Sequence, residues 1–351
     1  MNIHEDIHRH ETFMRRCLQL ASNGVFSAAP NPLVGAVIVY NDLIVGEGFH
    51  TAFGKNHAEI EAFNNVKDKS LLQQSTLYVN LEPCSHHGKT PPCVEAILKQ
   101  GIPRVVIANI DPFPKVRGNG ISILKENGVE VIEGVLAEEA AFLNRRFFHF
   151  HKNQKPYVIL KWAESQDGFM DARRNGEQGI NWISGPEAKK LVHTWRASEQ
   201  SILVGSQTAL NDNPSLTVRE VSGKNPLRIV IDRNLVVPND SKIFSNESET
   251  IVVNDKLSKT NDTIEWVKFD FSENVIDQLL SLLFERNIIS IIVEGGARTL
   301  VHFIDEDKWD EARVITGNIF LEQGLSAPEL KYFPVLLEKS GSDTIRYFYR
   351  T

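Results

Sequence analysis

The sequence predicts an α/β protein with two domains in tandem. Three observations indicate this. The chain has 351 residues, more than one domain usually holds; strand-like and helical segments alternate in both halves; and a polar stretch, HKNQKP at 151–156, separates the halves. Alternating strands and helices form a sheet that is covered by helices on both faces. We therefore expect one α/β domain over residues 1–152 and a second over residues 153–351.

The elements of the first half follow from apolar periodicity and turn residues. A helical apolar face runs from about Asp6 to Ser22, and the apolar segments 34–40 and 43–49 flank Asn41-Asp42, which is a hairpin signal. Because a hairpin makes its two strands antiparallel, the sheet should be mixed. Further helices are expected at 57–66, 91–101, 118–128 and 137–149, and further strands at 76–82, 104–110 and 129–134.

The second half repeats the alternation without repeating any motif of the first. Strands are expected at 157–163, 201–205, 227–232, 250–254, 290–296 and 311–317, and helices at 186–197, at 275–286 and from residue 297. Gly295-Gly296 between a strand and a helix leaves backbone N–H groups that can meet a phosphate. No GxGxxG segment occurs, which argues against the dinucleotide-binding fold that carries that motif.

Composition excludes several classes of protein. The net charge of −7 argues against a general nucleic-acid binder, although a local basic pocket for one phosphate is compatible with it. No apolar stretch approaches the roughly 18 residues that span a membrane, and the N-terminus carries both signs of charge, unlike a secretory signal. Three cysteines are a poor disulfide framework. We therefore expect a cytoplasmic protein that contacts neither membrane nor nucleic acid.

The strongest local signal is a set of metal-ligating residues around a carboxylate. His57 stands two residues before Glu59, and Cys84 and Cys93 follow. One histidine and two cysteines supply the three protein ligands of a catalytic zinc site, and the fourth position holds water. Glu59 is then the natural group to carry protons between that water and a leaving nitrogen.

Each of these residues has an ordinary structural alternative. A His-x-Glu segment is usually a solvated helix start, and a free cysteine is usually a small core residue. The order of the four residues favours zinc, because zinc base deaminases carry His-x-Glu followed by Pro-Cys-x-x-Cys. Here the two cysteines are nine positions apart, and the polar, basic segment SHHGKTPP between them suits a small phosphorylated substrate.

Three segments, PNPLVGAVIV (30–39), HAE (57–59) and LEPCSHHGKTPPC (81–93), resemble the bifunctional deaminase–reductases of bacterial riboflavin synthesis, and the likeness extends over nearly the whole chain. The resemblance implies a cytidine-deaminase-like mixed-sheet domain followed by a dihydrofolate-reductase-like α/β domain, with Zn²⁺ and NADPH as cofactors. It implies metal ligation by His57, Cys84 and Cys93, proton transfer by Glu59, and substrate contacts by Asn31, His50, His86 and Lys89.

The resemblance also covers the second half, from YVILKWAESQDG (157–168) onward. It implies NADPH contacts by Ala163, Trp182, Thr208, Asp212, Gly296, Ala297, Arg298, Thr299, Leu300, Val301 and His302. It implies substrate contacts by Arg196, Leu216, Arg219 and Glu294. The two arginines suit a planar grip on the sugar phosphate. At one substrate position the chain departs from the family, because Ile180 stands where a serine is expected.

The function implied by this resemblance is a pair of consecutive reactions. The first domain would deaminate a diaminopyrimidinone ribosyl phosphate with zinc, and the second would reduce the ribosyl group to ribityl with NADPH. We further expect a homo-oligomer. Two alternatives remain open from the residues: a monofunctional zinc deaminase with a structural second domain, and an enzyme that acts on nucleic-acid bases.

Overall fold

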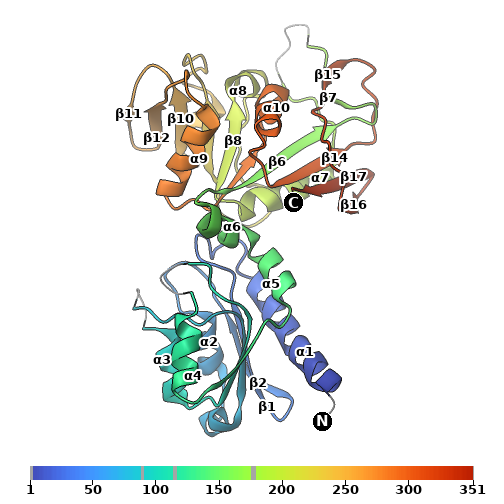
Figure 1. Ribbon diagram of the computed structural model, residues 1–351. Coiled ribbons are helices and arrows are strands. Elements are labelled where there is room, and N and C mark those ends of the chain that lie inside the picture. The colour runs from blue at the N-terminus through green and yellow to red at the C-terminus, as the bar shows by residue number, and fades with distance from the viewer. Residues whose placement is uncertain (1–2, 88–90, 114–116, 175–178, 351) are drawn as a thin grey trace. The chain divides into compact units, whose positions relative to one another are not determined.

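The chain forms two compact units, Met1–Gln154 and Lys155–Thr351 (Figure 1). The computed structural model describes residues 3–87, 91–113, 117–174 and 179–350. The division between the units falls two residues after the boundary that the polar stretch predicts. Within the described residues, none of the helices combines the length and the apolar character that crossing a membrane requires.

The first unit is built on a five-stranded mixed sheet with the order β2-β1-β3-β4-β5. The strands are β1 Gly35–Tyr40, β2 Leu43–Phe49, β3 Thr76–Leu81, β4 Arg104–Asn109 and β5 Glu130–Glu133. β1 pairs antiparallel with β2 and β3, whereas β3, β4 and β5 run parallel. The hairpin turn between β1 and β2 uses left-handed backbone at Asn41 and Asp42, which these two residue types tolerate. The predicted mixed sheet is confirmed.

Helices cover both faces of this sheet. On one face, apolar side chains of α1 (Ile3–Ser22) and α5 (Ala137–Leu143) are buried against the strands. On the other face lie α2 (Ala58–Asn65), α3 (Cys93–Gln100) and α4 (Asn119–Glu126). A short 3-10 helix, η1 (Lys69–Gln74), precedes β3. The sheet therefore positions the starts of α2 and α3, which carry His57 and Cys93, two of the three predicted zinc ligands.

The helix expected at 137–149 is wrong as a single element. It is divided into α5 and α6 (Arg145–Asn153), with Asn144 between them. Asn144 is buried, and its side-chain amide accepts a hydrogen bond from the Leu33 N–H at 2.8 Å and donates one to the Leu33 carbonyl at 2.9 Å. These tertiary hydrogen bonds hold Asn144 where the helix breaks, and the apolar periodicity of the segment does not reveal them.

The second unit contains a ten-stranded sheet with the order β11-β12-β10-β9-β8-β13-β6-β14-β17-β16. The central strands run parallel, and β11, β17 and β16 are antiparallel to their neighbours. The strands are β6 Tyr157–Glu164, β8 Ser201–Gly205, β9 Leu227–Ile231, β10 Thr250–Asn254, β11 Lys259–Thr260, β12 Ile264–Lys268, β13 Ser290–Val293, β14 Glu311–Thr316, β16 Leu336–Ser340 and β17 Asp343–Tyr349. A separate two-stranded sheet joins β7 (Phe169–Ala172) to β15 (Gly324–Ser326). Sequence periodicity misses β7, β11, β12 and the strands after β14, several of which are short or mostly exposed.

Helices cover both faces of the large sheet in the second unit. Buried side chains of α7 (Pro186–Ser198) and α8 (Ser206–Asp212) pack on one face. Those of α9 (Val275–Glu285) and α10 (Ala297–Asp305) pack on the other. A 3-10 turn, η2 (Lys242–Phe244), lies between β9 and β10. Because the adjacent strands β8 and β13 lead to α8 and α10 on opposite faces, their carboxyl ends form a switch point, where ligands bind in open α/β sheets.

Candidate functional site

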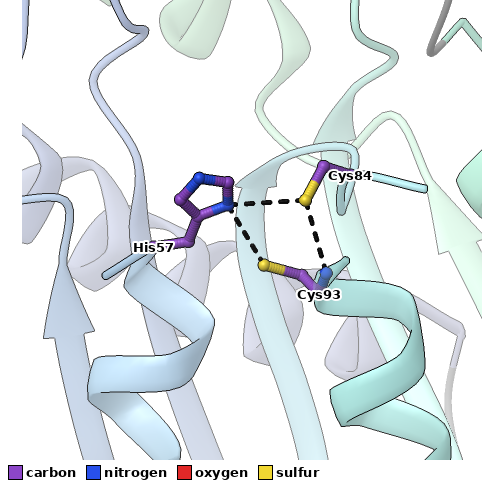
Figure 2. A group of neighbouring side chains, drawn as sticks. All are labelled: His57, Cys84 and Cys93. Carbon is purple, nitrogen blue, oxygen red and sulfur yellow. Dashed lines mark hydrogen bonds between the residues drawn. The ribbon is translucent and has the colours of Figure 1, made fainter. Parts of the chain in front are cut away.

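The three predicted metal ligands converge in the first unit (Figure 2). His57 is the N-cap residue of α2, Cys93 is the first residue of α3, and Cys84 lies in the loop after β3. His57 Nδ1 is 3.2 Å from Cys93 Sγ and 3.4 Å from Cys84 Sγ. A tetrahedral zinc ion would separate nitrogen and sulfur ligands by about 3.6 Å, as its bond lengths require. The donor set and its spacing therefore fit zinc.

The electrostatics of the cluster favour a thiolate at Cys84. Hydrogen bonds from Cys93 and from His57 lower the pKa of Cys84 well below its usual value, and the hydrogen bond to Cys84 raises the pKa of His57. The Cys93 backbone N–H, at the start of α3, also donates to Cys84 Sγ at 3.3 Å. A thiolate is the form of cysteine that ligates zinc, and the N-terminus of a helix favours it.

Glu59 lies beside the ligands and is buried. It is the second residue of α2, is 3% exposed, and interacts with Cys93. Burial raises the pKa of its carboxyl group above the usual value, and the charge on Cys84 raises it further. A carboxyl group whose pKa is raised toward neutrality can both accept a proton and return it, as a general acid–base residue must.

His50 and Asn31, two predicted substrate residues of the first unit, lie near the same cluster. The Asn31 side-chain amide is 3.0 Å from His50 Nε2, and His50 Nδ1 is 3.0 Å from the Asn56 carbonyl oxygen. The rings of His50 and His57 meet edge to face at 5.7 Å. Two of the predicted substrate contacts are therefore next to the metal ligand. His86 is exposed, and Lys89 lies outside the described residues.

Glu82 organises the wall of this site, and the sequence analysis did not single it out. Its buried carboxylate accepts hydrogen bonds from the backbone N–H groups of Asp111, Gly118, Gly120 and Ile121, at 2.9–3.3 Å. These donors lie in the loop after β4 and at the start of α4. The sequence does point to Glu82 in one respect, because it stands two residues before the proposed ligand Cys84.

The second unit contains a pocket of about 620 Å³ that is lined by residues of β6, of α7, of the loop after α8 and of the segment around η2. It brings together six predicted residues: Ile180, Trp182, Arg196, Asp212, Leu216 and Arg219. It also includes Lys161, Lys189, His193 and Lys242, which the sequence analysis did not single out. The charged lining residues are therefore mostly basic, as an anionic substrate requires.

A buried ion-pair cluster lies at this pocket. Arg196 donates two hydrogen bonds to the Glu294 carboxylate, at 2.9 and 2.7 Å, and Lys161 Nζ is 3.5 Å from it. The two cations lower the pKa of Glu294 to about 2 despite its burial, and burial lowers the pKa of Lys161. Lys161 could have been noticed in the sequence, because a lysine within the apolar strand YVILKWA is rarely buried unless it is paired.

The two predicted arginines differ in what they contact. Arg196 is engaged by Glu294, because a buried carboxylate needs a cationic partner. The Arg219 guanidinium is exposed and contacts only the hydroxyl groups of Ser215 and Thr217 in the described part of the chain. Both arginines line the pocket, so the expected grip on phosphate stays a prediction; of the two, only Arg219 has no carboxylate partner among the described residues. Leu216, beside it, is buried in left-handed backbone (φ 54°), a strained conformation typical of functional positions.

Three predicted cofactor residues, Thr208, Gly296 and Thr299, lie at the switch point between β8 and β13. The glycine N-caps of α8 and α10 carry no side-chain cap, so the first backbone N–H groups of both helices can meet an anion. A Cβ on Gly205 would lie 2.7 Å from Thr299 Oγ1, and one on Gly296 would lie 3.0 Å from Thr208 Oγ1. A side chain at either position would have to displace one of these threonine hydroxyl groups, so the two glycines leave a cradle of backbone N–H groups at the starts of α8 and α10.

The remaining predicted cofactor residues are spread more widely. Ala163 lies on β6, and Trp182 is 57% exposed with Lys189 Nζ 4.8 Å above its ring. Asp212 is paired with Arg174 at 2.7 Å. Of the segment from Gly296 to His302, Ala297, Arg298 and Thr299 form the first turn of α10, and Leu300 is buried in the core. Val301 and His302 lie on the second turn, farther from the helix start.

Comparison with known families matches both units separately. Residues 7–109 match the cytidine and deoxycytidylate deaminase zinc-binding region, and residues 156–344 match the RibD C-terminal domain. The fold and the site thus define a two-domain enzyme with a zinc deaminase unit followed by a reductase unit.

Relatives of full length join the two units in the same order. The riboflavin biosynthesis protein RibD of Aquifex aeolicus is 37% identical over 356 residues, which cover 97% of this chain and 98% of that protein. A Thermotoga maritima structure described as a diaminohydroxyphosphoribosylaminopyrimidine deaminase/5-amino-6-(5-phosphoribosylamino)uracil reductase superposes with a TM-score of 0.90 at 36% identity, covering 99% of this chain and 100% of that one. The Acinetobacter baumannii RibD structure gives 0.89 at 31% identity, covering 98% and 99%. The chain belongs to the RibD family of riboflavin biosynthesis proteins.

Family membership decides between the functional alternatives that the residues left open. The chain is bifunctional and combines a deaminase with a reductase, as the resemblance implied. The monofunctional alternative is wrong, because residues 156–344 match the reductase family and full-length relatives share both units. The alternative of an enzyme for nucleic-acid bases is also set aside, since those relatives are riboflavin biosynthesis proteins.

Proposed function

We propose that the first unit deaminates a diaminopyrimidinone ribosyl phosphate and that the second reduces the deaminated product with NADPH. The main support for the first step is that His57, Cys84 and Cys93 converge beside the buried carboxyl group of Glu59. The name of the Thermotoga maritima relative supports the choice of substrate and the order of the reactions.

In the deaminase site, each group of the chain has a distinct task. His57, Cys84 and Cys93 would hold zinc, which when bound supplies a hydroxide at neutral pH. Glu59 accepts the proton of the attacking water as oxygen adds to the amino-bearing ring carbon. It then returns a proton to the amino nitrogen, so that the carbon–nitrogen bond breaks and ammonia leaves. Asn31 and His50 would orient the pyrimidine, with His86 and Lys89 toward its phosphate.

In the reductase site, the chain positions the two reactants. The cradle at the starts of α8 and α10 would bind NADPH, which when bound supplies a hydride. The pocket around Arg219 and Leu216 would hold the ribosyl phosphate with its anomeric carbon toward the nicotinamide. Opening of the sugar ring leaves an oxygen that needs a proton. Lys161, the partly buried ammonium group beside Glu294, is the lining residue suited to supply it.

One assay tests both steps in sequence. The purified chain is supplied with zinc, the diaminopyrimidinone ribosyl phosphate and NADPH, and ammonia release and the loss of NADPH absorbance are followed together. We expect one NADPH oxidised for each ammonia released, with NADH a poorer donor. Ammonia release without NADPH oxidation would contradict the assignment of the second unit, and absence of both would contradict the substrate.

We also propose where the protein is located in the cell and what kind of ligand it binds. A net charge of −7 and free cysteines at the metal site support a cytoplasmic enzyme that binds a small phosphorylated pyrimidine and no nucleic acid.

We also propose a homo-oligomer that associates through the edge strand β16. This strand pairs only with β17, and Leu336 and Leu337 on it are 52% and 63% exposed, next to Phe333 at 93%. An exposed apolar edge strand is a template for pairing with another chain. Sedimentation should show a dimer or larger species that Leu337→Lys weakens, whereas a monomer at high concentration would contradict the proposal.

A further inference from the structure

A histidine that no assignment above uses lies within the basic part of the reductase pocket. His193 is on α7, is only 2% exposed, and lines the pocket together with Arg196 and Arg219. Burial lowers the pKa of His193 to about 4, and the charges of the two arginines lower it further. The imidazole ring is therefore neutral at physiological pH.

The hydrogen bonding of the ring selects one of its two neutral tautomers. The backbone N–H of Arg219 donates to His193 Nδ1 at 3.2 Å, so Nδ1 must carry the lone pair. In a neutral imidazole the proton then sits on the other nitrogen, Nε2, which becomes a hydrogen-bond donor. Within the described part of the chain Nε2 has no hydrogen-bond partner.

The surroundings of this donor indicate an anion as its ligand. Arg219 places its guanidinium on the Ser215 and Thr217 hydroxyl groups of the same loop, and no carboxylate is paired with it in the part of the chain that the structure describes. Arg196, by contrast, is already neutralised by Glu294. A phosphate that enters the pocket would therefore meet the Arg219 charge and the neutral His193 donor, which are held together by one backbone hydrogen bond.

We propose that His193 donates a hydrogen bond from Nε2–H to the phosphate of the reductase substrate, beside the Arg219 guanidinium. The assignment rests on the proposed function of the second unit and adds a binding residue to it. The Arg219 backbone couples the two contacts, because the residue that supplies the charge also sets the tautomer of the neutral donor. His193 is thus a substrate-binding residue with no part in proton transfer.

Two amide substitutions distinguish a phosphate-binding role of His193 from a purely structural one. In His193→Asn the side-chain oxygen takes the place of Nδ1 and keeps the bond to the Arg219 backbone, but no donor reaches the position of Nε2. In His193→Gln the longer amide places an N–H near Nε2 and loses the bond to the backbone. If His193 only supports the loop, Asn should resemble the wild type and Gln should be impaired; if it binds phosphate, the order is reversed.

The decisive measurement is the KM for the deaminated substrate at saturating NADPH. We expect His193→Asn to raise this KM on the order of tenfold or more, the usual effect of losing one hydrogen bond to a charged group, and His193→Gln to raise it less. The kcat and the KM for NADPH should change little in either variant. Thr194→Ala, the next residue of α7, whose hydroxyl bonds to the Lys190 carbonyl in its own helix, is the control and should match the wild type.

A second measurement does not depend on turnover. In the ¹⁵N spectrum of the labelled wild-type protein, the signals lost in His193→Asn identify His193 among the 11 histidines of the chain. We expect the shifts of a neutral ring protonated at Nε2, and a change in the Nε2 shift on titration with inorganic phosphate.

The two measurements separate failure of this inference from failure of the proposed function. Protonation at Nδ1, no response of Nε2 to phosphate, or an unchanged KM in His193→Asn would each overturn the inference. A wild-type protein that does not oxidise NADPH with the deaminated substrate would instead contradict the proposed function, while a phosphate response at Nε2 would still support the anion contact.

Discussion

Among single residues, Glu59 has the most sharply defined role. It is buried, its pKa is raised by that burial, and it lies beside Cys93, a proposed zinc ligand. Its side chain is not itself one of the three metal donors. A glutamine of the same shape should therefore leave metal binding intact and abolish only the proton transfer.

We expect Glu59→Gln to lower the deamination rate by at least about 100-fold, the usual contribution of a general acid–base group, while zinc content stays near that of the wild type. Ammonia release and elemental analysis on the same sample provide the measurement. Reduction of separately supplied deaminated substrate is the control and should be unchanged. If both activities fell together, the assignment of one reaction to each unit would fail.

Arg219 differs from Arg196 because its guanidinium has no carboxylate partner in the described structure. Losing its contact with the substrate phosphate should cost about 1.5–3 kcal/mol of substrate binding in Arg219→Ala. Arg219→Lys should recover only part of this, since an ammonium group cannot make a two-point contact with phosphate. Titration of substrate at fixed NADPH measures the effect, and an unchanged affinity would leave Arg219 an ordinary surface charge.

The effects of Arg219→Ala can be compared with those of Arg196→Ala. Because it neutralises the buried Glu294, Arg196→Ala leaves a buried carboxylate without its closest cation and should lower the stability of the second unit as well as substrate affinity. Arg219→Ala should leave stability within about 0.5 kcal/mol of the wild type, as exposed substitutions usually do. A denaturant midpoint for each variant distinguishes the two roles.

At the scale of elements, the loop between β4 and α4 is held by one side chain. Glu82 accepts four backbone hydrogen bonds from this loop and the start of α4, and a Cβ on Gly120 would lie 2.2 Å from the Pro83 carbonyl oxygen. The strand that leads to Cys84 is thereby tied to α4. The geometry of the loop that carries Cys84 thus depends on the Glu82 carboxylate, which is not one of the three proposed metal ligands.

Glu82→Gln should destabilise the first unit by about 2 kcal/mol, because its amide nitrogen would face backbone donors and charge-assisted bonds would be lost. Thermal unfolding of the zinc-loaded protein measures the change, and deamination should fall with it. Glu126→Gln, an exposed carboxylate at the end of α4, is the control. A Glu82→Gln protein as stable as the wild type would show that solvent or the neighbouring backbone replaces these bonds.

At the scale of the whole molecule, zinc should act on one unit only. All three ligands belong to the first unit, and a ligand that binds the native state stabilises it by about 2.7 kcal/mol when its free concentration is 100 times Kd. We expect about one zinc per chain. Its removal by a chelator should lower the unfolding temperature of the first unit and leave that of the second unchanged.

Calorimetry of the metal-loaded and chelated protein tests this expectation, with NADPH as the reciprocal ligand that should shift only the second transition. Cys84→Ala should behave like the chelated wild type and should no longer respond to zinc. Equal shifts of both transitions on chelation would show that the units do not unfold independently.

Local sequence chemistry determined much of this protein. The period of the apolar residues indicated two α/β units, the Asn41-Asp42 turn made the first sheet mixed, and the order of His57, Glu59, Cys84 and Cys93 indicated zinc. These signals can be recognised in the sequence because each depends on residues close together in the chain or on a set of donor atoms that few other chemistries need.

Tertiary structure alone decided the features that depend on partners distant in sequence. Asn144 divides a helix because it bonds to Leu33, over one hundred positions away. Arg196 faces Glu294 while Arg219 remains unpaired with any described carboxylate, and the Arg219 backbone sets the tautomer of His193. Which charge is neutralised, and which donor is left for a ligand, follows from the packing of separate strands and helices around one pocket, since hydrogen bonds and ion pairs are satisfied in space and not along the chain.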